Sequence, residues 1–109
     1  MAADLSIVLE GTLGTSSTAL NSNGSAYTVP ASRKLIIMEM NLVNKTATDA
    51  TATLTDSNGV TLFPGKKVPA NDGYLQIRQT QILAGDQVLG FASAVSSIDY
   101  YLSCLEVDA

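Results

Sequence analysis

The sequence predicts an all-β protein, a single-domain antiparallel β-sandwich or jelly-roll-like barrel of about 7–8 strands. Apolar and polar residues alternate with a period of two, as in Ala50–Thr55, and no window shows the i, i+3, i+4, i+7 apolar spacing of an amphipathic helix. Turn residues divide these runs at short intervals, which is typical of sandwiches and barrels. The 109 residues are enough for one domain with one core.

The expected strands are runs rich in β-branched residues that end at turn signals. Residues that tolerate positive φ mark the turns. These turns are expected at Asn23-Gly24, Ser57-Asn58-Gly59, Asn71-Asp72-Gly73 and Ala84-Gly85-Asp86. Proline donates no hydrogen bond to a ladder, so strand edges or loops are expected at Pro30, Pro64 and Pro69. The expected strands cover residues 5–10, 26–29, 34–44, 50–56, 60–63, 74–83, 87–93 and 97–107.

The N-terminal part of the chain, residues 1–25, is expected to be a first strand followed by a flexible loop or arm. Residues 26–109 are expected to form the sandwich core of the same domain. The segment Gly11–Ser25 is rich in small polar residues, so it is either a long mobile loop or an arm that orders only against a partner. Residues 1–6 have no basic stretch and no long apolar run, so we expect no secretory signal.

The strand expected at residues 34–44 is apolar on both faces. Strict alternation places Ile36, Met38, Met40 and Leu42 on one face, and the residues from Leu35 to Val43 at odd positions on the other. Such a strand needs cover on both sides. The outer cover is either a loop of the same chain or another subunit, and the low charge of the chain favours a subunit. We therefore predict partner contacts at Leu5, Ile7, Leu9, Leu13, Leu35, Ile37, Glu39, Asn41 and Val43.

Two other strands are expected to be half-buried. Residues 50–56 alternate alanine and leucine with threonine, which gives one apolar face and one hydroxyl face. Near the C-terminus, the apolar residues from Ile98 to Cys104 at even positions share one face, and the opposite face is mixed. Tyr100 and Tyr101 point to opposite sides, so one of them should be exposed or lie in an interface.

The composition excludes several classes of function. Charged residues are only 15%, against about 25% in a typical protein, and the net charge is −4. No basic surface exists for a nucleic acid or an anionic membrane. The apolar stretch at residues 35–43 is far shorter than the roughly 20 residues of a membrane helix. Histidine is absent, which removes imidazole acid–base chemistry and imidazole metal ligands. We expect no cofactor and no metal.

Four motifs resemble catalytic or ligand-binding sites, but each is better explained by a structural role. Asp72 and Asp86 stand in turns, where aspartate bonds the local backbone. The segment 56–59 begins like a calcium loop but lacks the later ligands. Gly65-Lys66-Lys67 lacks the first glycine and the closing Ser or Thr of a phosphate loop. Cys104 has no histidine partner and is expected to be a core thiol. We therefore predict that the chain is not an enzyme.

A series of short motifs covers residues 26–107. In order they are Tyr27-Thr-Val-Pro-Ala31, Lys34-Leu-Ile-Ile-Met38, Asn41-Leu-Val-Asn44, the Thr/Ala strand Ala50–Thr55, Leu62-Phe-Pro64, Val68-Pro-Ala70, Ile82-Leu-Ala-Gly-Asp86 and Leu102-Ser-Cys-Leu-Glu106. This arrangement resembles the small β-sandwich structural proteins of tailed-bacteriophage virions, among them the capsid decoration (cement) proteins.

The resemblance implies a non-enzymatic virion protein that is made in the host cytoplasm. Its most specific form is a decoration protein on the capsid surface. Such a protein would be a homo-oligomer, with a trimer favoured, and would contact the major capsid protein or other virion proteins. Many weak contacts on a symmetric shell would then add through effective concentration. A tail, fibre or head–tail module that binds a host receptor or glycan is the alternative, and an exposed aromatic groove would favour it.

Overall fold

The structure, a computed structural model, describes residues 3–77 and 79–109. Over those residues the chain forms strands and turns and contains no helix, so none is present that could cross a membrane. The predicted all-β class is confirmed. The strands are β1 (Leu5–Thr12), β2 (Thr18–Ala19), β3 (Asn21–Ser22), β4 (Ser25–Ala26), β5 (Arg33–Asn44), β6 (Ala50–Asp56), β7 (Thr61–Val68), β8 (Gly73–Gln76), β9 (Thr80–Ile82), β10 (Val88–Ala92) and β11 (Ile98–Asp108).

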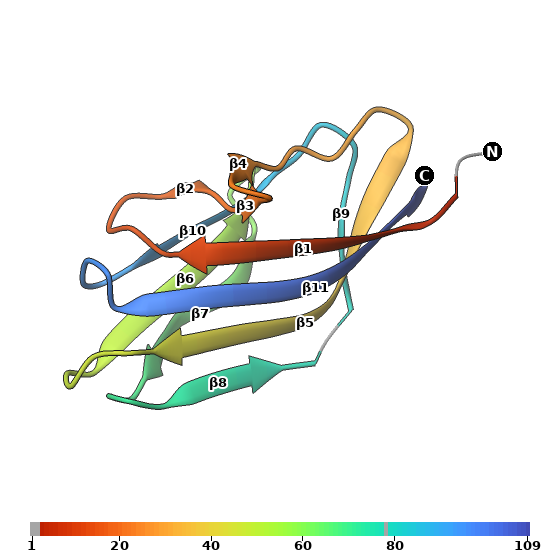
Figure 1. Cartoon of the computed structure of the whole chain (residues 1–109). Helices are drawn as coiled ribbons and strands as arrows, with labels where there is room; N and C mark the ends of the chain where they lie inside the picture. The colour runs from red at the N-terminus through yellow and green to blue at the C-terminus, as the bar shows by residue number, and fades with distance from the viewer. Residues whose placement is uncertain (1–2, 78) are drawn as a thin grey trace.

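The strands form a β-sandwich of two larger antiparallel sheets (Figure 1). The five-stranded sheet has the order β1-β11-β5-β8, and β9 pairs with the first part of β5 on the same side as β8. The four-stranded sheet has the order β2-β10-β6-β7, and β3 pairs with β4 as a small separate hairpin. The two longest strands, β5 and β11, are neighbours in the middle of the five-stranded sheet.

A β-bulge interrupts the pairing of β5 with β11. Ser103 pairs with Glu39, but the next residue of β11, Cys104, pairs with Ile37. Met38 is therefore an extra residue in the ladder, and its side chain is 37% exposed. An inserted residue reverses which face the following side chains occupy.

Because of the bulge, the side chains of the strand at residues 34–44 do not lie on the two faces that were predicted. Leu35 and Ile37 face the core before the bulge, and Met40 and Leu42 face it afterwards; all four are at most 1% exposed. The expectation of one strict alternation along this strand is therefore wrong. The pairing with β11 causes the difference, because it accommodates one more residue on β5 than on its partner.

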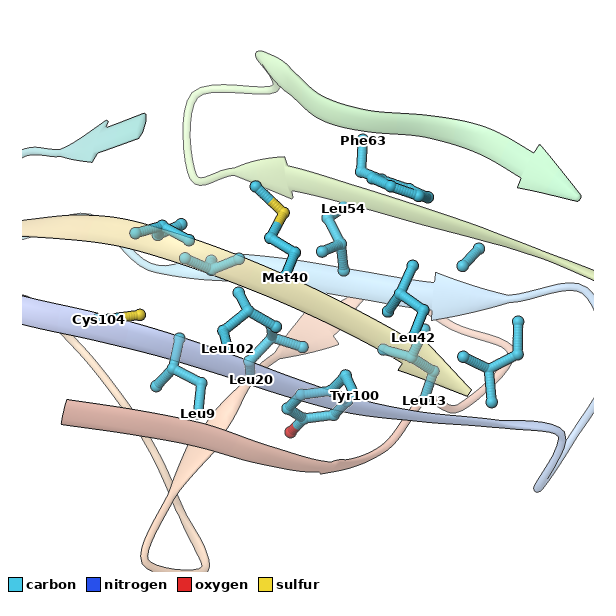
Figure 2. Close-up of a cluster of buried hydrophobic side chains, with 14 of the residues drawn as sticks. Leu9, Leu13, Leu20, Met40, Leu42, Leu54, Phe63, Tyr100, Leu102 and Cys104 are labelled. Atoms are coloured by element: carbon cyan, nitrogen blue, oxygen red, sulfur yellow. The ribbon is translucent and has the colours of Figure 1, made fainter. Parts of the chain in front are cut away.

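The segment Gly11–Ser25 contributes to the same core as the rest of the chain. It contains β2, β3 and β4, and its residues Leu13 and Leu20 are each only 2% exposed (Figure 2). Gly90 on β10 makes room for them, because a Cβ there would stand 3.0 Å from a methyl carbon of Leu13 and 3.3 Å from one of Leu20. These leucines belong to one hydrophobic cluster that draws on both larger sheets.

Most predicted strand positions agree with the structure, and three differ. The strand expected at 26–29 is reduced to β4, which ends at Ala26. The strand expected at 74–83 is divided into β8 and β9. The strand expected at 60–63 continues as β7 to Val68 and includes Pro64. A proline is tolerated there because β7 is an edge strand of its sheet.

Candidate functional site

The nine residues that were predicted to contact a partner fall into a buried group and an exposed group. Four of them lie in the core and are at most 2% exposed, namely Leu9, Leu13, Leu35 and Ile37. A side chain without exposed surface cannot contact a partner in this conformation, so the assignment is corrected for these four. The other five are partly or largely exposed, and partner contact stays a prediction for them: Leu5, Ile7, Glu39, Asn41 and Val43.

The outer face of the five-stranded sheet brings distant parts of the sequence together. Tyr101 on β11 pairs with Glu10 on β1 and with Asn41 on β5, and Asn41 also pairs with Leu75 on β8. These four residues form a row across the sheet. Tyr101 is 46% exposed and Leu75 is 51% exposed, and Val43 in the adjacent row is 47% exposed.

The row borders a shallow, open hollow of about 490 Å³. The residues that line it are Glu10, Gly11, Thr12, Asn41, Val43, Asp99, Tyr100 and Tyr101. Tyr100 is 5% exposed, and its Oη accepts a hydrogen bond of 2.9 Å from the backbone N–H of Asn21. Gly11 lies against this ring, because a Cβ there would stand 2.8 Å from Tyr100 Oη. The Tyr100 ring therefore belongs to the core side of the sheet, and Tyr101 is the exposed tyrosine of the hollow.

Asp99 is the best-held carboxylate of the hollow. Its Oδ1 accepts a hydrogen bond of 2.5 Å from the Thr12 hydroxyl and one of 2.9 Å from the ammonium group of Lys45. The hydrogen bond from Thr12, with that from Lys45 and the positive charge of Lys45, lowers the pKa of Asp99. Partial burial opposes this shift without reversing it. Asp99 is consequently ionised and fixed in orientation at neutral pH.

A second polar cluster lies along β11, centred on Arg33 and Glu106. Arg33 Nε is 3.2 Å from Glu106 Oε2, and a terminal nitrogen of the same guanidinium is 2.6 Å from Asp108 Oδ1. The Tyr27 hydroxyl donates a 2.6 Å hydrogen bond to Glu106, and burial together with that carboxylate raises the pKa of Tyr27. Arg33 also donates to the carbonyl oxygen of Ala3 at 2.8 Å. These bonds hold the start of β1 against the end of β11, so the cluster has a structural role.

The predicted local hydrogen bond of a turn carboxylate is present at Asp72, whereas the Asp86 carboxylate accepts a 3.2 Å hydrogen bond from the Asn58 side chain in another turn. Asp56 Oδ1 accepts hydrogen bonds from the backbone N–H groups of Asn58 and Val60, at 2.9 and 3.0 Å. Asp72 Oδ1 accepts one from the N–H of Gly73 at 2.8 Å. These carboxylates thus stabilise turns.

The remaining candidate groups carry no catalytic arrangement. Cys104 is 5% exposed, and burial raises the pKa of its thiol to about 12, so the reactive thiolate is not formed near neutral pH. Lys67 pairs with Asp49 at 3.1 Å, and Lys66 lies 5.2 Å from the centre of the Tyr74 ring. Among the described residues there is no group of three or more Cys, Asp or Glu side chains placed to hold a metal ion.

Sequence reasoning missed three residues of the hollow: Glu10, Thr12 and Asp99. Each stands in a strand without a motif around it, and only the pairing of β1 with β11 brings them together. The adjacent residues Tyr100 and Tyr101 were the sequence feature that could have indicated this part of the sheet. The prediction that Tyr100 and Tyr101 face opposite sides is confirmed, since Tyr100 is buried and Tyr101 is exposed.

Comparison with known proteins shows the fold of the chain. No protein-family model and no curated protein matches the sequence. A chain in the acidic stable capsid structure of Helicobacter pylori bacteriophage KHP30 is similar in structure, with a TM-score of 0.59 and 7% identity over 97% of this chain and 88% of that one. A chain of the Bacillus endospore appendages, described as disulfide-linked pili, has a TM-score of 0.54 and 10% identity over 97% and 87% of the two chains. At these identities the likeness shows a shared β-sandwich fold.

Proposed function

We propose that the chain is a non-enzymatic structural protein of a tailed-phage virion. The observation that carries this proposal is the outer face of the five-stranded sheet, where Met38, Val43, Leu75 and Tyr101 are each at least 37% exposed. Groups of exposed apolar side chains mark interaction surfaces. An assembly contact on this face would bury these side chains.

The two structural neighbours support a role in assembly. One belongs to a phage capsid structure and the other to a pilus, and both are β-sandwich chains of similar length to this one. In its most specific form, we propose a decoration protein at the capsid surface that forms a homo-oligomer, with a trimer favoured, on the major capsid protein. Each contact can be weak, because repeated contacts on a symmetric shell add through effective concentration.

The sandwich suits such a role because one end of its five-stranded sheet is held. The Arg33 guanidinium bonds Glu106 and Asp108 on β11 and the carbonyl of Ala3 before β1. Local opening at this end of the sheet must break these bonds together, and this opposes fraying.

The assembly contact is tested by light scattering after size exclusion. We expect the purified chain to be an oligomer, and Leu75→Asp to weaken association about tenfold or more, because a carboxylate would be buried in the contact. Thr51→Asp is the matched control, since Thr51 is exposed on β6 in the other sheet. A chain that is monomeric at all concentrations, or equal effects of both substitutions, would contradict a self-association on this face. Deleting residues 2–25 is a poor test, because it removes core leucines such as Leu13 and Leu20.

The position in the virion is tested by antibody labelling. Antibodies raised against the folded chain are applied to virions of the phage that carries the gene and viewed by electron microscopy. Label over the head supports the decoration role. Label confined to the tail or fibres supports the alternative, a module that binds a host receptor or glycan, and virions without label contradict both.

The alternative has one specific observation in its favour. Tyr101 is an exposed aromatic side chain beside a hollow that also contains carboxylate and amide groups. This arrangement leads to a more specific inference about that hollow.

A further inference from the structure

We infer that the hollow on the outer face of the five-stranded sheet binds a neutral saccharide. Its volume of about 490 Å³ lies within the range of small-molecule sites, about 300–1,000 Å³. It is open on one side, which suits a ligand that keeps part of its surface in water. Val43 and Tyr101 also belong to the face proposed above for the assembly contact, so the inference rests on the alternative function and applies to the chain with this face free.

The lining matches both surfaces of a sugar ring. A pyranose presents a face of C–H groups and a rim of hydroxyl groups. The Tyr101 ring and the Val43 side chain, each nearly half exposed, offer apolar surface for the C–H face. Hydroxyl groups both donate and accept hydrogen bonds. The Asn41 amide can do both, and the carboxylates of Glu10 and Asp99 accept.

The site is held in place before any ligand arrives. Its residues come from β1, β5 and β11, which are adjacent in the sheet and pair in regular register over residues 10–12, 41–43 and 99–101. Thr12 and Lys45 both donate hydrogen bonds to Oδ1 of Asp99 and so orient its carboxylate. Groups positioned on rigid strands lose little conformational entropy on binding, and this favours even a weak ligand.

The charges of the hollow favour a neutral ligand. The carboxylates of Glu10 and Asp99 would repel an acidic sugar. A basic ligand such as an arginine side chain is also disfavoured, because the Lys45 ammonium already lies 2.9 Å from Asp99 and offsets its charge. The Asn41 amide adds donors that a cation cannot use. Mixed donors and acceptors around an aromatic ring fit a polyhydroxyl compound better than an ion of either sign.

The test is a titration of the ¹⁵N-labelled chain with maltose, cellobiose and N,N′-diacetylchitobiose, followed by NMR amide shifts. We expect at least one disaccharide to give saturable shifts at residues 10–12, 41–43 and 99–101, with a dissociation constant on the order of 1 mM. Tyr101→Ala should weaken binding about tenfold or more, because it removes the stacking surface. Asn41→Ala should weaken it to a lesser extent.

Two variants serve as controls. Tyr101→Phe keeps the ring and should bind within about threefold of the parent chain. Thr51→Asp, at an exposed position on β6 in the other sheet, leaves both the hollow and the proposed assembly face unchanged and should bind like the parent. Circular dichroism of each variant checks that the fold is retained, which we expect because none of Tyr101, Asn41 and Thr51 is buried.

Several results would overturn the inference. These are the absence of saturable shifts with all three disaccharides, shifts that lie away from the hollow, or unchanged binding by Tyr101→Ala. Tighter binding of the peptide acetyl-Arg-Gly-Arg-amide at the same amides would also overturn it, and would identify the hollow as a site for a basic segment of a partner protein. Saccharide binding that is lost in Tyr101→Ala supports the inference, and light scattering of the same samples measures the assembly contact separately.

Discussion

Replacing Gly11 by alanine tests how the N-terminal segment is joined to the five-stranded sheet. The new Cβ would stand 2.8 Å from Tyr100 Oη and 3.1 Å from its Cζ, whereas ordinary contacts begin near 3.4 Å. The ring has little freedom to withdraw, because it is 5% exposed and its Oη accepts the hydrogen bond from Asn21. Overpacking costs about 1–3 kcal/mol, and a broken Asn21 bond adds about 1 kcal/mol. We expect Gly11→Ala to lower the free energy of unfolding by about 2–4 kcal/mol.

Urea unfolding followed by far-ultraviolet circular dichroism measures this loss. Gly14→Ala is the matched control from the same segment, because nothing lies within 4 Å of a Cβ at that position. We expect the control to change the free energy of unfolding by at most about 0.5 kcal/mol. In thermal unfolding, Gly11→Ala should lower the midpoint by about 8–16 °C, since each kcal/mol corresponds to about 4 °C in a domain of this size.

A double-mutant cycle with Tyr100→Phe isolates the contact. Phenylalanine removes the oxygen at 2.8 Å, so the nearest ring atom to the new Cβ is then at 3.1 Å. The alanine at position 11 should therefore be less harmful when it is combined with Tyr100→Phe, with a coupling of about 1 kcal/mol between the two changes. Equal effects of Gly11→Ala and Gly14→Ala, or additive effects in the cycle, would refute the proposed contact.

Three further predictions follow from the core and the charges. The Cys104 thiol, whose pKa burial raises to about 12, should not react with Ellman's reagent at pH 8 until urea unfolds the chain; fast reaction in the folded state would contradict its burial. Leu102→Ala, at a side chain with 0% exposure, should lower the free energy of unfolding by about 2–5 kcal/mol in the urea assay, and a loss below about 1 kcal/mol would contradict the packing. The Thr12 hydroxyl and Lys45 lower the pKa of Asp99 in the folded chain. The ionised Asp99 carboxylate therefore contributes to stability above the ordinary carboxyl pKa of about 4. This contribution is lost as the pH falls through the pKa of Asp99 in the folded chain. Asp99→Asn should flatten the stability profile in that acidic range, and an unchanged profile would refute the assignment.

Local patterns predicted most strand positions because they depend on neighbouring residues alone. The threonine alternation placed a strand at residues 50–56, and β6 has those bounds. The turn at Ser57-Asn58-Gly59 was predicted from residue type, and Gly59 adopts a φ of 81°. Side-chain alternation and positive φ are properties of a few consecutive residues, so they can be read without the fold.

Pairing between strands could not be predicted in the same way. The outer-face assignment of Leu35 and Ile37 was wrong because the bulge at Met38 arises from the partner strand β11. The sequence of β5 alone contains no signal for the extra residue. The cluster at Arg33 was missed for the same reason, since its partner Glu106 is 73 positions away.

The amino-acid sequence was sufficient to establish the all-β class, the absence of histidine chemistry and the opposite orientations of Tyr100 and Tyr101. Only the tertiary structure decided that Leu13 and Leu20 of the segment Gly11–Ser25 belong to the core and which of the two tyrosines is exposed. It also decided that Thr12 and Asp99, 87 positions apart, share a hydrogen bond beside an open hollow. The reason is that alternation is local, whereas register and burial depend on contacts between strands that meet only when the chain has folded.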